Sequence, residues 1–148
     1  MYWFHVSVHA RPRSVQLGPI VPLRGLHLQS LAVSPLALNE PLGCSFEEAQ
    51  CRLDSLERML FEPDGSFVWV SDETAAEPWQ LDGMLLDRNR RLYSAEIKGN
   101  CCDESLDILL SALGWPGTDL IFQLTHEAIF LDEGEFRRLA ALHPNPTP

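Results

Sequence analysis

Between residues 79 and 99, two runs of alternating apolar and polar residues flank a polar cluster at residues 87–90. Alternation with a period of two is typical of half-buried β-strands, so this stretch predicts a β-hairpin with a short loop. The core-facing pairs expected from the alternation are Trp79 with Gly99, Leu81 with Ile97, and Leu85 with Tyr93. Because successive side chains point to opposite faces, the same register places Asp82 directly opposite Glu96 on the outer face, with Lys98 beside them.

Two carboxylates that face each other across a hairpin repel unless another group compensates their charge. A metal ion or a substrate could provide that compensation. We therefore expect the functional site of this chain, if it has one, to lie at Asp82 and Glu96.

Helical spacing appears on both sides of this hairpin. Ser45 and Glu48 form a capping-box pattern, and the apolar spacing behind it predicts a helix over residues 46–60. A second helix is expected at residues 103–113 with Asp103 as its N-cap, and a third after Asp132. The remaining expected strands are residues 66–70, 120–124 and 128–131. The resulting order is α-β-β-β-α-β with an added C-terminal strand and helix, which predicts an α/β (α+β) fold with a central mixed sheet flanked by helices.

Prolines divide the chain into three parts. Residues 1–43 contain five prolines and no sustained period apart from an edge strand at residues 3–8, so we expect a poorly ordered extension or an artefact of the assigned start codon. A basic arm that contacts a partner is the functional alternative for this segment. Residues 44–142 are expected to form a single globular domain, and residues 143–148 a disordered tail.

Charge is unevenly distributed along the 148 residues, whose net charge is −10. Residues 1–43 carry three arginines and one glutamate, whereas the remainder carries 8 basic and 20 acidic residues. Contacts to phosphates supply most of the non-specific affinity for nucleic acid, so the negative charge of this domain disfavours nucleic acid as a partner. It suits binding to a basic protein instead.

Neither a membrane segment nor a disulfide framework is indicated by the sequence. No apolar run approaches the roughly 18 residues that a spanning helix needs, and the N-terminus lacks a signal-peptide pattern, so we expect a cytoplasmic protein. The cysteines, which are Cys44, Cys51, Cys101 and Cys102, lack the spacing of a zinc site and are expected to be reduced and mostly buried. A thiol nucleophile assisted by His126 is the less favoured alternative to an exposed loop histidine.

The element order, the aspartate on the second expected strand and the sequence Glu96-Ile97-Lys98 on the third resemble the PD-(D/E)XK nuclease superfamily, over about residues 45–125. This resemblance implies a restriction-endonuclease-like core that hydrolyses phosphodiesters of nucleic acid. It implies that Asp82 and Glu96 bind a divalent metal ion, usually Mg²⁺, and that Lys98 orients or activates the attacking water. Glu47 or, in our assignment, Glu48 on the first helix would be a further metal ligand. Carboxylates are the ligands that Mg²⁺ prefers, which agrees with this assignment.

Several features depart from that family. Leu81 stands where a proline often precedes the aspartate, and the helix after Lys98 begins with two acidic residues. A solvent-exposed strand face with Lys98 between two acids would give the same pattern without any catalysis. Two hypotheses therefore remain: a magnesium-dependent endonuclease, and a non-catalytic acidic module that binds a basic protein through residues such as Asp72, Glu73 and Glu77.

Overall fold

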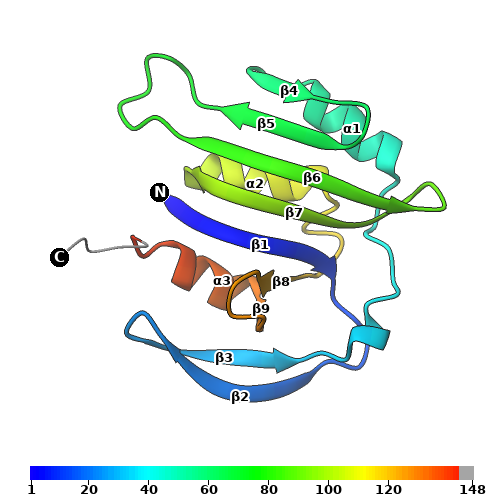
Figure 1. The fold of residues 1–148 in the computed structure, drawn as a ribbon, viewed down its shortest axis with the longest axis vertical. Coiled ribbons are helices and arrows are strands. Elements are labelled where there is room, and N and C mark those ends of the chain that lie inside the picture. The colour runs from blue at the N-terminus through cyan, green and yellow to red at the C-terminus, as the bar shows by residue number, and fades with distance from the viewer. Residues whose placement is uncertain (144–148) are drawn as a thin grey trace.

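The computed structural model describes residues 1–143, which form one nine-stranded sheet and three α-helices (Figure 1). The strands are β1 (Tyr2–Ala10), β2 (Gln16–Leu23), β3 (Leu26–Ala32), β4 (Met59–Phe61), β5 (Ser66–Val70), β6 (Gln80–Arg88), β7 (Arg91–Cys101), β8 (Leu120–Leu124) and β9 (Phe130–Asp132). The helices are α1 (Phe46–Asp54), α2 (Asp103–Ala112) and α3 (Glu133–Ala140), with a short 3-10 helix η1 (Pro35–Ala37).

Every strand pairing in this sheet is antiparallel, and the spatial order is β2-β3-β9-β8-β1-β7-β6-β5-β4. The expected mixed α-β-β-β-α-β core with helices on both sides is therefore wrong. Hairpin connections join β4 to β7 in sequence, and the N-terminal strand β1 inserts between β7 and β8, so no parallel pair forms. The fold is α+β.

The expectation that residues 1–43 form a poorly ordered extension is also wrong. These residues include β1, which occupies the middle of the sheet, and the β2–β3 hairpin at one edge. Prolines 19 and 22 lie in the edge strand β2, where a missing N–H costs no ladder hydrogen bond. Arg24 and Gly25 make a two-residue turn with positive φ angles of 50° and 79°, which is typical of tight hairpins. The expected domain boundary at residue 43 does not exist, because β1 contributes Val6 and Val8 to the central core.

The β6–β7 hairpin forms as expected, but its register differs by two residues from the one predicted. Its loop is Asn89 and Arg90 alone, and a bulge between Leu86 and Asp87 then shifts the pairing. The two-residue loop changes the pairing by one residue and the bulge by one more, so the side chains of β6 and those of β7 from Ala95 onward keep their predicted faces. Tyr93, expected in the core opposite Leu85, lies at the bulge and is only half-buried, and Leu85 pairs with Ala95 instead. The partners change, however: Asp82 lies opposite Lys98, and Glu96 lies opposite Met84.

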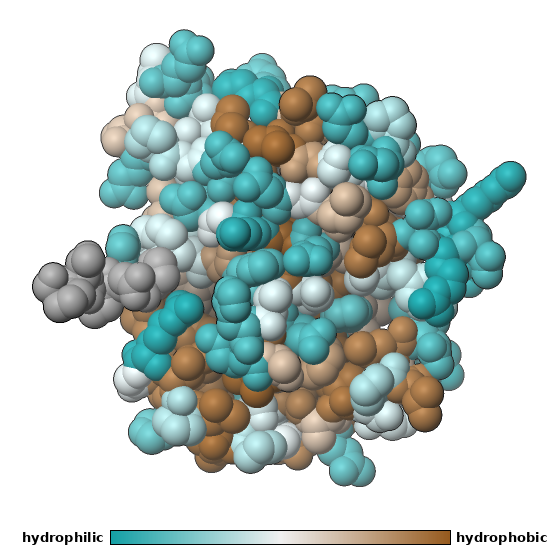
Figure 2. Space-filling view, viewed as in Figure 1, coloured by the Kyte–Doolittle hydropathy of each residue, from teal (hydrophilic) through white to brown (hydrophobic). Residues whose placement is uncertain are grey.

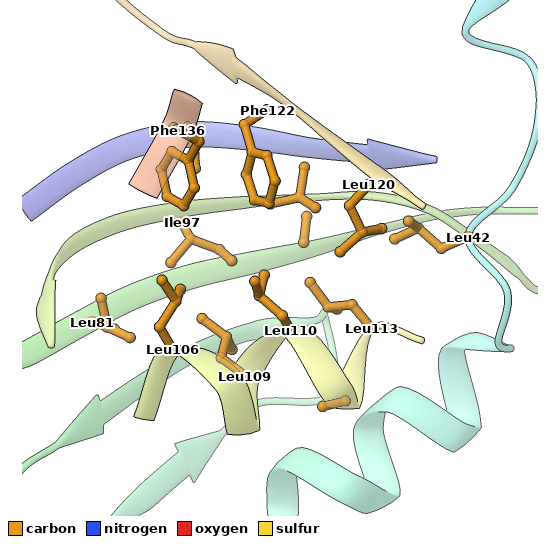
Figure 3. Close-up of a cluster of buried hydrophobic side chains, with 14 of the residues drawn as sticks. Leu42, Leu81, Ile97, Leu106, Leu109, Leu110, Leu113, Leu120, Phe122 and Phe136 are labelled. Atoms are coloured by element: carbon orange, nitrogen blue, oxygen red, sulfur yellow. The ribbon is translucent and has the colours of Figure 1, made fainter. Parts of the chain in front are cut away.

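All three helices pack on one face of the sheet. The capping box at Ser45 and Glu48 is confirmed, but α1 ends at Asp54 instead of residue 60, and the following residues form β4. The Asp132 cap of α3 is confirmed, whereas α2 has Cys102 at its N-cap. The α2 leucines pack against strand residues that include Leu81, Ile97 and Phe122, as Figure 3 shows. The buried face of the sheet is therefore the helix side.

The opposite face carries no helix in the described residues. In Figure 1, β6 and β7 pass in front of α2, so the view looks onto this face. Figure 2 shows mainly hydrophilic residues at its centre and hydrophobic ones gathered towards the β2–β3 end. None of the described helices is long and apolar enough to cross a membrane. The predicted tail, residues 143–148, lies outside the described residues apart from His143.

Candidate functional site

A notch interrupts the sheet beside the N-terminal half of β1. Strand β1 has nine residues, but the next two strands towards β3, β8 and β9, have only five and three, and β8 pairs with β1 only from Val6 onward. In Figure 1 no strand lies between the start of β1 and the β2–β3 hairpin tip, and α3 is seen there. Three strand spacings separate β1 from β3 in the sheet order, or about 14 Å at about 4.8 Å each.

A cavity of about 540 Å³ occupies this notch, a size typical of ligand sites. Its apolar lining comes from α3, the first residues of β1 and the end of β8, namely Phe4, Leu124, Phe136, Leu139 and Ala140. Its polar lining consists of His5, Arg24, Lys98, Asn100, His126 and Glu127. The cavity thus combines an apolar floor with a group of cationic or titratable side chains.

Within the polar lining, His5 pairs with Glu96, which is not itself a lining residue. His5 on β1 and Glu96 on β7 project from the same face, and His5 Nε2 lies 3.1 Å from Glu96 Oε1. The His126 ring, in the turn after β8, meets the His5 ring edge-on with centroids 5.5 Å apart. The strand register sets this arrangement, because Glu96 is opposite Ser7 and Lys98 is opposite His5.

A lysine and an arginine line the same cavity without an ion pair. Lys98 projects from β7 beside His5, and Arg24 reaches the cavity from the β2–β3 turn. Within residues 1–143, neither side chain makes a salt bridge or a hydrogen bond to a neighbouring side chain. Glu127 is the acidic residue of the lining, so Arg24 and Lys98 outnumber it and leave a local site for negative charge in a chain with net charge −10.

Asp82, the first predicted site residue, lies outside this cavity. It accepts a hydrogen bond from Gln80 Nε2 at 3.0 Å and is opposite Lys98 on one side and Val68 on the other. The predicted head-on meeting of Asp82 with Glu96 does not occur, because the two-residue loop and the bulge after Leu86 together move Glu96 two positions along.

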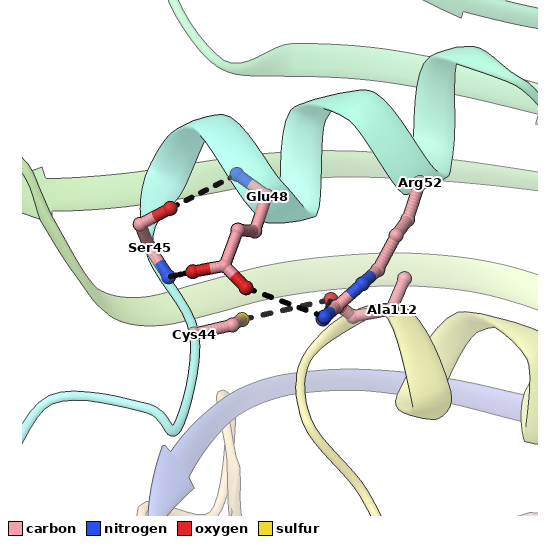
Figure 4. A network of polar contacts seen from close by, with 5 residues as sticks. All are labelled: Cys44, Ser45, Glu48, Arg52 and Ala112. Carbon is pink, nitrogen blue, oxygen red and sulfur yellow. Dashed lines mark hydrogen bonds and ion pairs between the residues drawn. The ribbon is translucent and has the colours of Figure 1, made fainter.

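Glu48 lies on the helix side of the sheet (Figure 4). Its carboxylate accepts from the Ser45 backbone N–H at 3.2 Å and pairs with Arg52 at 3.4 Å, and Arg52 in turn donates to the Ala112 carbonyl of α2. These contacts fix α1 against α2. Glu48 therefore has a structural role at the helix junction and does not approach Asp82 or Glu96.

The predicted magnesium ligands do not fit a metal site. Asp82 faces a lysine, Glu96 pairs with a histidine, and Glu48 lies across the sheet. Among the described residues, no group of three or more His, Cys, Asp or Glu side chains could hold a metal ion. The cysteines are free, with Cys44 and Cys101 buried and Cys51 exposed.

The sequence placed Glu96 and Lys98 in a candidate site but missed His5, His126 and Arg24 as their neighbours. His5 lay in a segment expected to be disordered, although residues 3–8 carried the signal of a strand. Arg24 belongs to an Arg-Gly turn between two β-prone runs, a hairpin signal that the prolines of β2 obscured. His126 was assigned correctly to an exposed turn, but its proximity to β1 depends on the long-range pairing of β1 with β8.

Comparison with known proteins gave no match: no family model, curated protein or solved structure is significantly similar to this chain.

Proposed function

We propose that the protein is a non-catalytic binding module that holds an anionic ligand in the notch beside β1. The observation that carries this proposal is the position of Lys98 and Arg24, two unpaired cations on one cavity with an apolar floor. Carboxylate and phosphate groups are the anions that lysine and arginine recognise best. The apolar floor of α3 then favours a ligand that also has an apolar part.

The histidine–glutamate pair belongs to this binding site. The hydrogen bond that His5 Nε2 donates to Glu96 Oε1 holds the imidazole in place, and His126 packs on its ring. Both histidines line the cavity as hydrogen-bonding groups next to Lys98. They can therefore orient the ligand's anionic group without taking part in a reaction.

The geometry gives less support to the magnesium-dependent nuclease. That hypothesis needs Asp82 and Glu96 to share a metal ion, and these two carboxylates have different partners on the sheet. Its predicted nuclease core also differs from the antiparallel sheet of this protein.

A matched pair of small probes tests the proposed function. 4-Phenylbutyrate and phenylpropyl phosphate carry an anion on an apolar body, and 4-phenylbutanol has a similar body without charge. We expect NMR titration to show that both anions bind at the notch and that the alcohol binds at least tenfold more weakly. Lys98→Ala and Arg24→Asn should each lower the affinity for the anions about tenfold, which corresponds to about 1.4 kcal/mol. Asparagine suits position 24 because it tolerates the positive φ there.

Arg91→Ala provides the matched control, because it removes the same charge from an exposed position at the start of β7. Equal binding of the alcohol and the anions would contradict the proposal. So would an equal loss of affinity in Arg91→Ala, which would indicate a general effect of net charge.

Binding of a basic protein remains a second candidate, favoured by the charge of a different part of the molecule. Residues 44–82 hold ten acidic and two basic residues and form α1, β4, β5 and the loop that leads into β6. A basic partner bound there would be released by raised salt and by changing Glu73 and Glu77 to glutamine. Its binding would be unaffected by Lys98→Ala.

A further inference from the structure

We infer that the ligand of the notch is an extended peptide that pairs with the free edge of β1 as an added strand and carries alternating apolar and acidic side chains. This inference rests on the proposed function, because it identifies the class of anion that the same cavity binds. Three independent observations support it. Backbone groups of β1 lack a strand partner beside the notch, whereas backbone groups of β3 across the notch are bonded by α3. The two faces of the notch also differ, one being apolar and the other polar.

The backbone of β1 is unpaired on the side that faces the notch. The His5 carbonyl accepts from the Thr125 N–H at 3.1 Å, which fixes the direction in which odd-numbered residues of β1 point their backbone groups. The Trp3 N–H and C=O therefore point the same way, beyond the end of β8. No strand in residues 1–143 pairs with Trp3 on that side, and within those residues the Trp3 N–H and C=O are a donor and an acceptor of a sheet edge. The His143 ring packs on the Trp3 indole, with ring centroids 4.8 Å apart.

Across the notch, the edge of β3 is already satisfied by α3. The Gln29 N–H donates to Glu135 Oε2 at 2.8 Å, and the His27 carbonyl accepts from Arg138 at 3.2 Å. Glu135 and Arg138 are themselves an ion pair at 2.9 Å. The two walls therefore differ, and β1 is the edge that an incoming strand can use.

The two faces of the notch select different side chains. A strand added to β1 would direct the residue opposite Phe4 towards the apolar floor of Phe136 and Leu139. The residues on either side of it would point to the outer face, where His5, Lys98 and Arg24 lie. An alternating apolar and acidic sequence satisfies both faces, and β-strand addition is an established mode of peptide recognition.

The length of the site follows from the unpaired part of β1. Tyr2 to Phe4 lie before His5, whose carbonyl already accepts from Thr125, so about three ligand residues can pair, spanning about 10 Å at about 3.3 Å each. A nucleotide could place its phosphate beside Lys98 and Arg24, but it lacks the repeating N–H and C=O groups that match a sheet edge. The peptide is therefore favoured over a nucleic acid.

Peptides with selectively methylated amides test this inference on the unaltered protein. The parent is an acetylated seven-residue peptide of alternating glutamate and valine, and a control has the same composition with its valines in one block. Two further versions carry N-methyl groups on alternate amides, one on the glutamates and one on the valines. In an added strand, either the glutamate amides or the valine amides point to β1, but not both. N-methylation of the amides that point to β1 should lower the affinity of the peptide at least tenfold, whereas N-methylation of the others should be tolerated.

Hydrogen exchange reports the position of the bound peptide. We expect the Trp3 amide to exchange at least tenfold more slowly with the parent peptide bound, and not with the blocked control. Equal binding of both methylated versions with no protection of Trp3 would overturn the strand inference, while 4-phenylbutyrate binding that depends on Lys98 would still support the proposed function. Tighter binding of a short single-stranded oligonucleotide, without protection of Trp3, would also overturn it. If neither peptide nor phenylbutyrate binds, the proposed function fails as well.

Discussion

His9 on β1 is a histidine on the outer face of the sheet whose ring is partly buried by its neighbours. Its neighbours across the sheet are Ser94 on β7 and Ile121 on β8, and its ring lies 6.1 Å from that of Phe130. Its Nε2 atom is buried and has no hydrogen-bond partner in the described structure. Burial lowers the pKa of His9 below its ordinary value of 6.5, because the charged imidazolium would lose its hydration.

This lowered pKa predicts a loss of stability in mild acid. Below about pH 6.5 the unfolded chain takes up a proton at His9 that the folded protein does not, so the free energy of unfolding should fall as pH decreases from 6.5 towards the folded-state pKa. His9→Gln should remove this part of the decline. Urea denaturation at pH 7.5, 6.5 and 5.5 measures the effect.

His27→Gln serves as the control, because His27 is exposed on β3. An unchanged slope in His9→Gln would show that the decline arises elsewhere. Asp64 and Asp72, whose pKa values hydrogen bonds from Ser66 and Thr74 lower below 3.8, act only in stronger acid and do not confuse the result.

The cysteines differ sharply in expected reactivity. Burial raises the pKa of Cys101 to about 12, and the thiolate is the reactive form of cysteine. Cys51 is exposed on α1. We expect iodoacetamide at pH 8 to modify Cys51 in the folded protein and Cys101 only after denaturation. Peptide mapping by mass spectrometry checks this, and modification of Cys101 at the rate of Cys51 would contradict the burial.

At the scale of elements, the sequence predicted local structure better than it predicted pairing. The strand at residues 66–70 and the caps at Ser45 and Asp132 depend on neighbouring residues, and all three are confirmed. The position of β1 between β7 and β8 depends on contacts about ninety and more than one hundred residues away. No local period encodes such contacts, so the order of the sheet could not be inferred.

The candidate site was partly predictable for the same reason. The alternation in β7 correctly assigned Glu96 and Lys98 to the outer face. Their partners were wrong because the two-residue loop and a bulge, neither visible in the alternation itself, each moved the register by one residue. Asp82 thereby lost its predicted contact, and His5 became the partner of Glu96.

Gly83 on β6 is required by the ring of Phe67 on the neighbouring strand. A Cβ atom at position 83 would lie 2.0 Å from Phe67 Cζ, far inside contact distance. Gly83→Ala should therefore destabilise the fold by about 1–3 kcal/mol, because the ring must shift within a packed core. Chemical denaturation measures the change.

Gly134→Ala is the matched control for Gly83→Ala. A Cβ there would meet its nearest neighbour at 3.6 Å, an ordinary contact, and alanine favours the helix. In a Phe67→Leu background, Gly83→Ala should cost less than in the unaltered protein, since the two residues are coupled. An equal cost in both backgrounds would show that the ring is not the cause.

The whole molecule is divided by charge. One end of the sheet, formed by β4, β5 and α1, contains most of the excess acidic residues, and the other end contains the arginines of the first 43 residues and the exposed apolar residues Leu17 and Ile20. The notch lies beside β1, between these ends. The uneven charge along the sequence therefore corresponds to an uneven charge across the fold, and the cavity between the two ends is lined by Arg24 and Lys98 as well as Glu127.

The central position of β1 gives a prediction for the whole fold. Residues 44–148 contain the edge and centre strands β4–β7 and the short strands β8 and β9, but only β1 joins these two groups into one sheet. Val6 and Val8 of β1 are completely buried in the common core. We expect a chain that starts at residue 44 to lack a cooperative unfolding transition, because β7 and β8 would each expose an unpaired edge and apolar surface.

A protease site inserted after Asn39, in the loop before α1, provides a control in which the chain is cut but β1 is still present. Cleavage there leaves residues 1–39 paired in the sheet, so the nicked protein should keep a cooperative transition and its near-UV circular dichroism, whereas the fragment starting at residue 44 should keep neither. If that fragment instead unfolds cooperatively with native-like near-UV signals, β4–β9 and the helices form an independent domain, and β1 is only an addition to it. The same experiment tests the notch, because a protein without β1 has no edge for the proposed peptide to pair with.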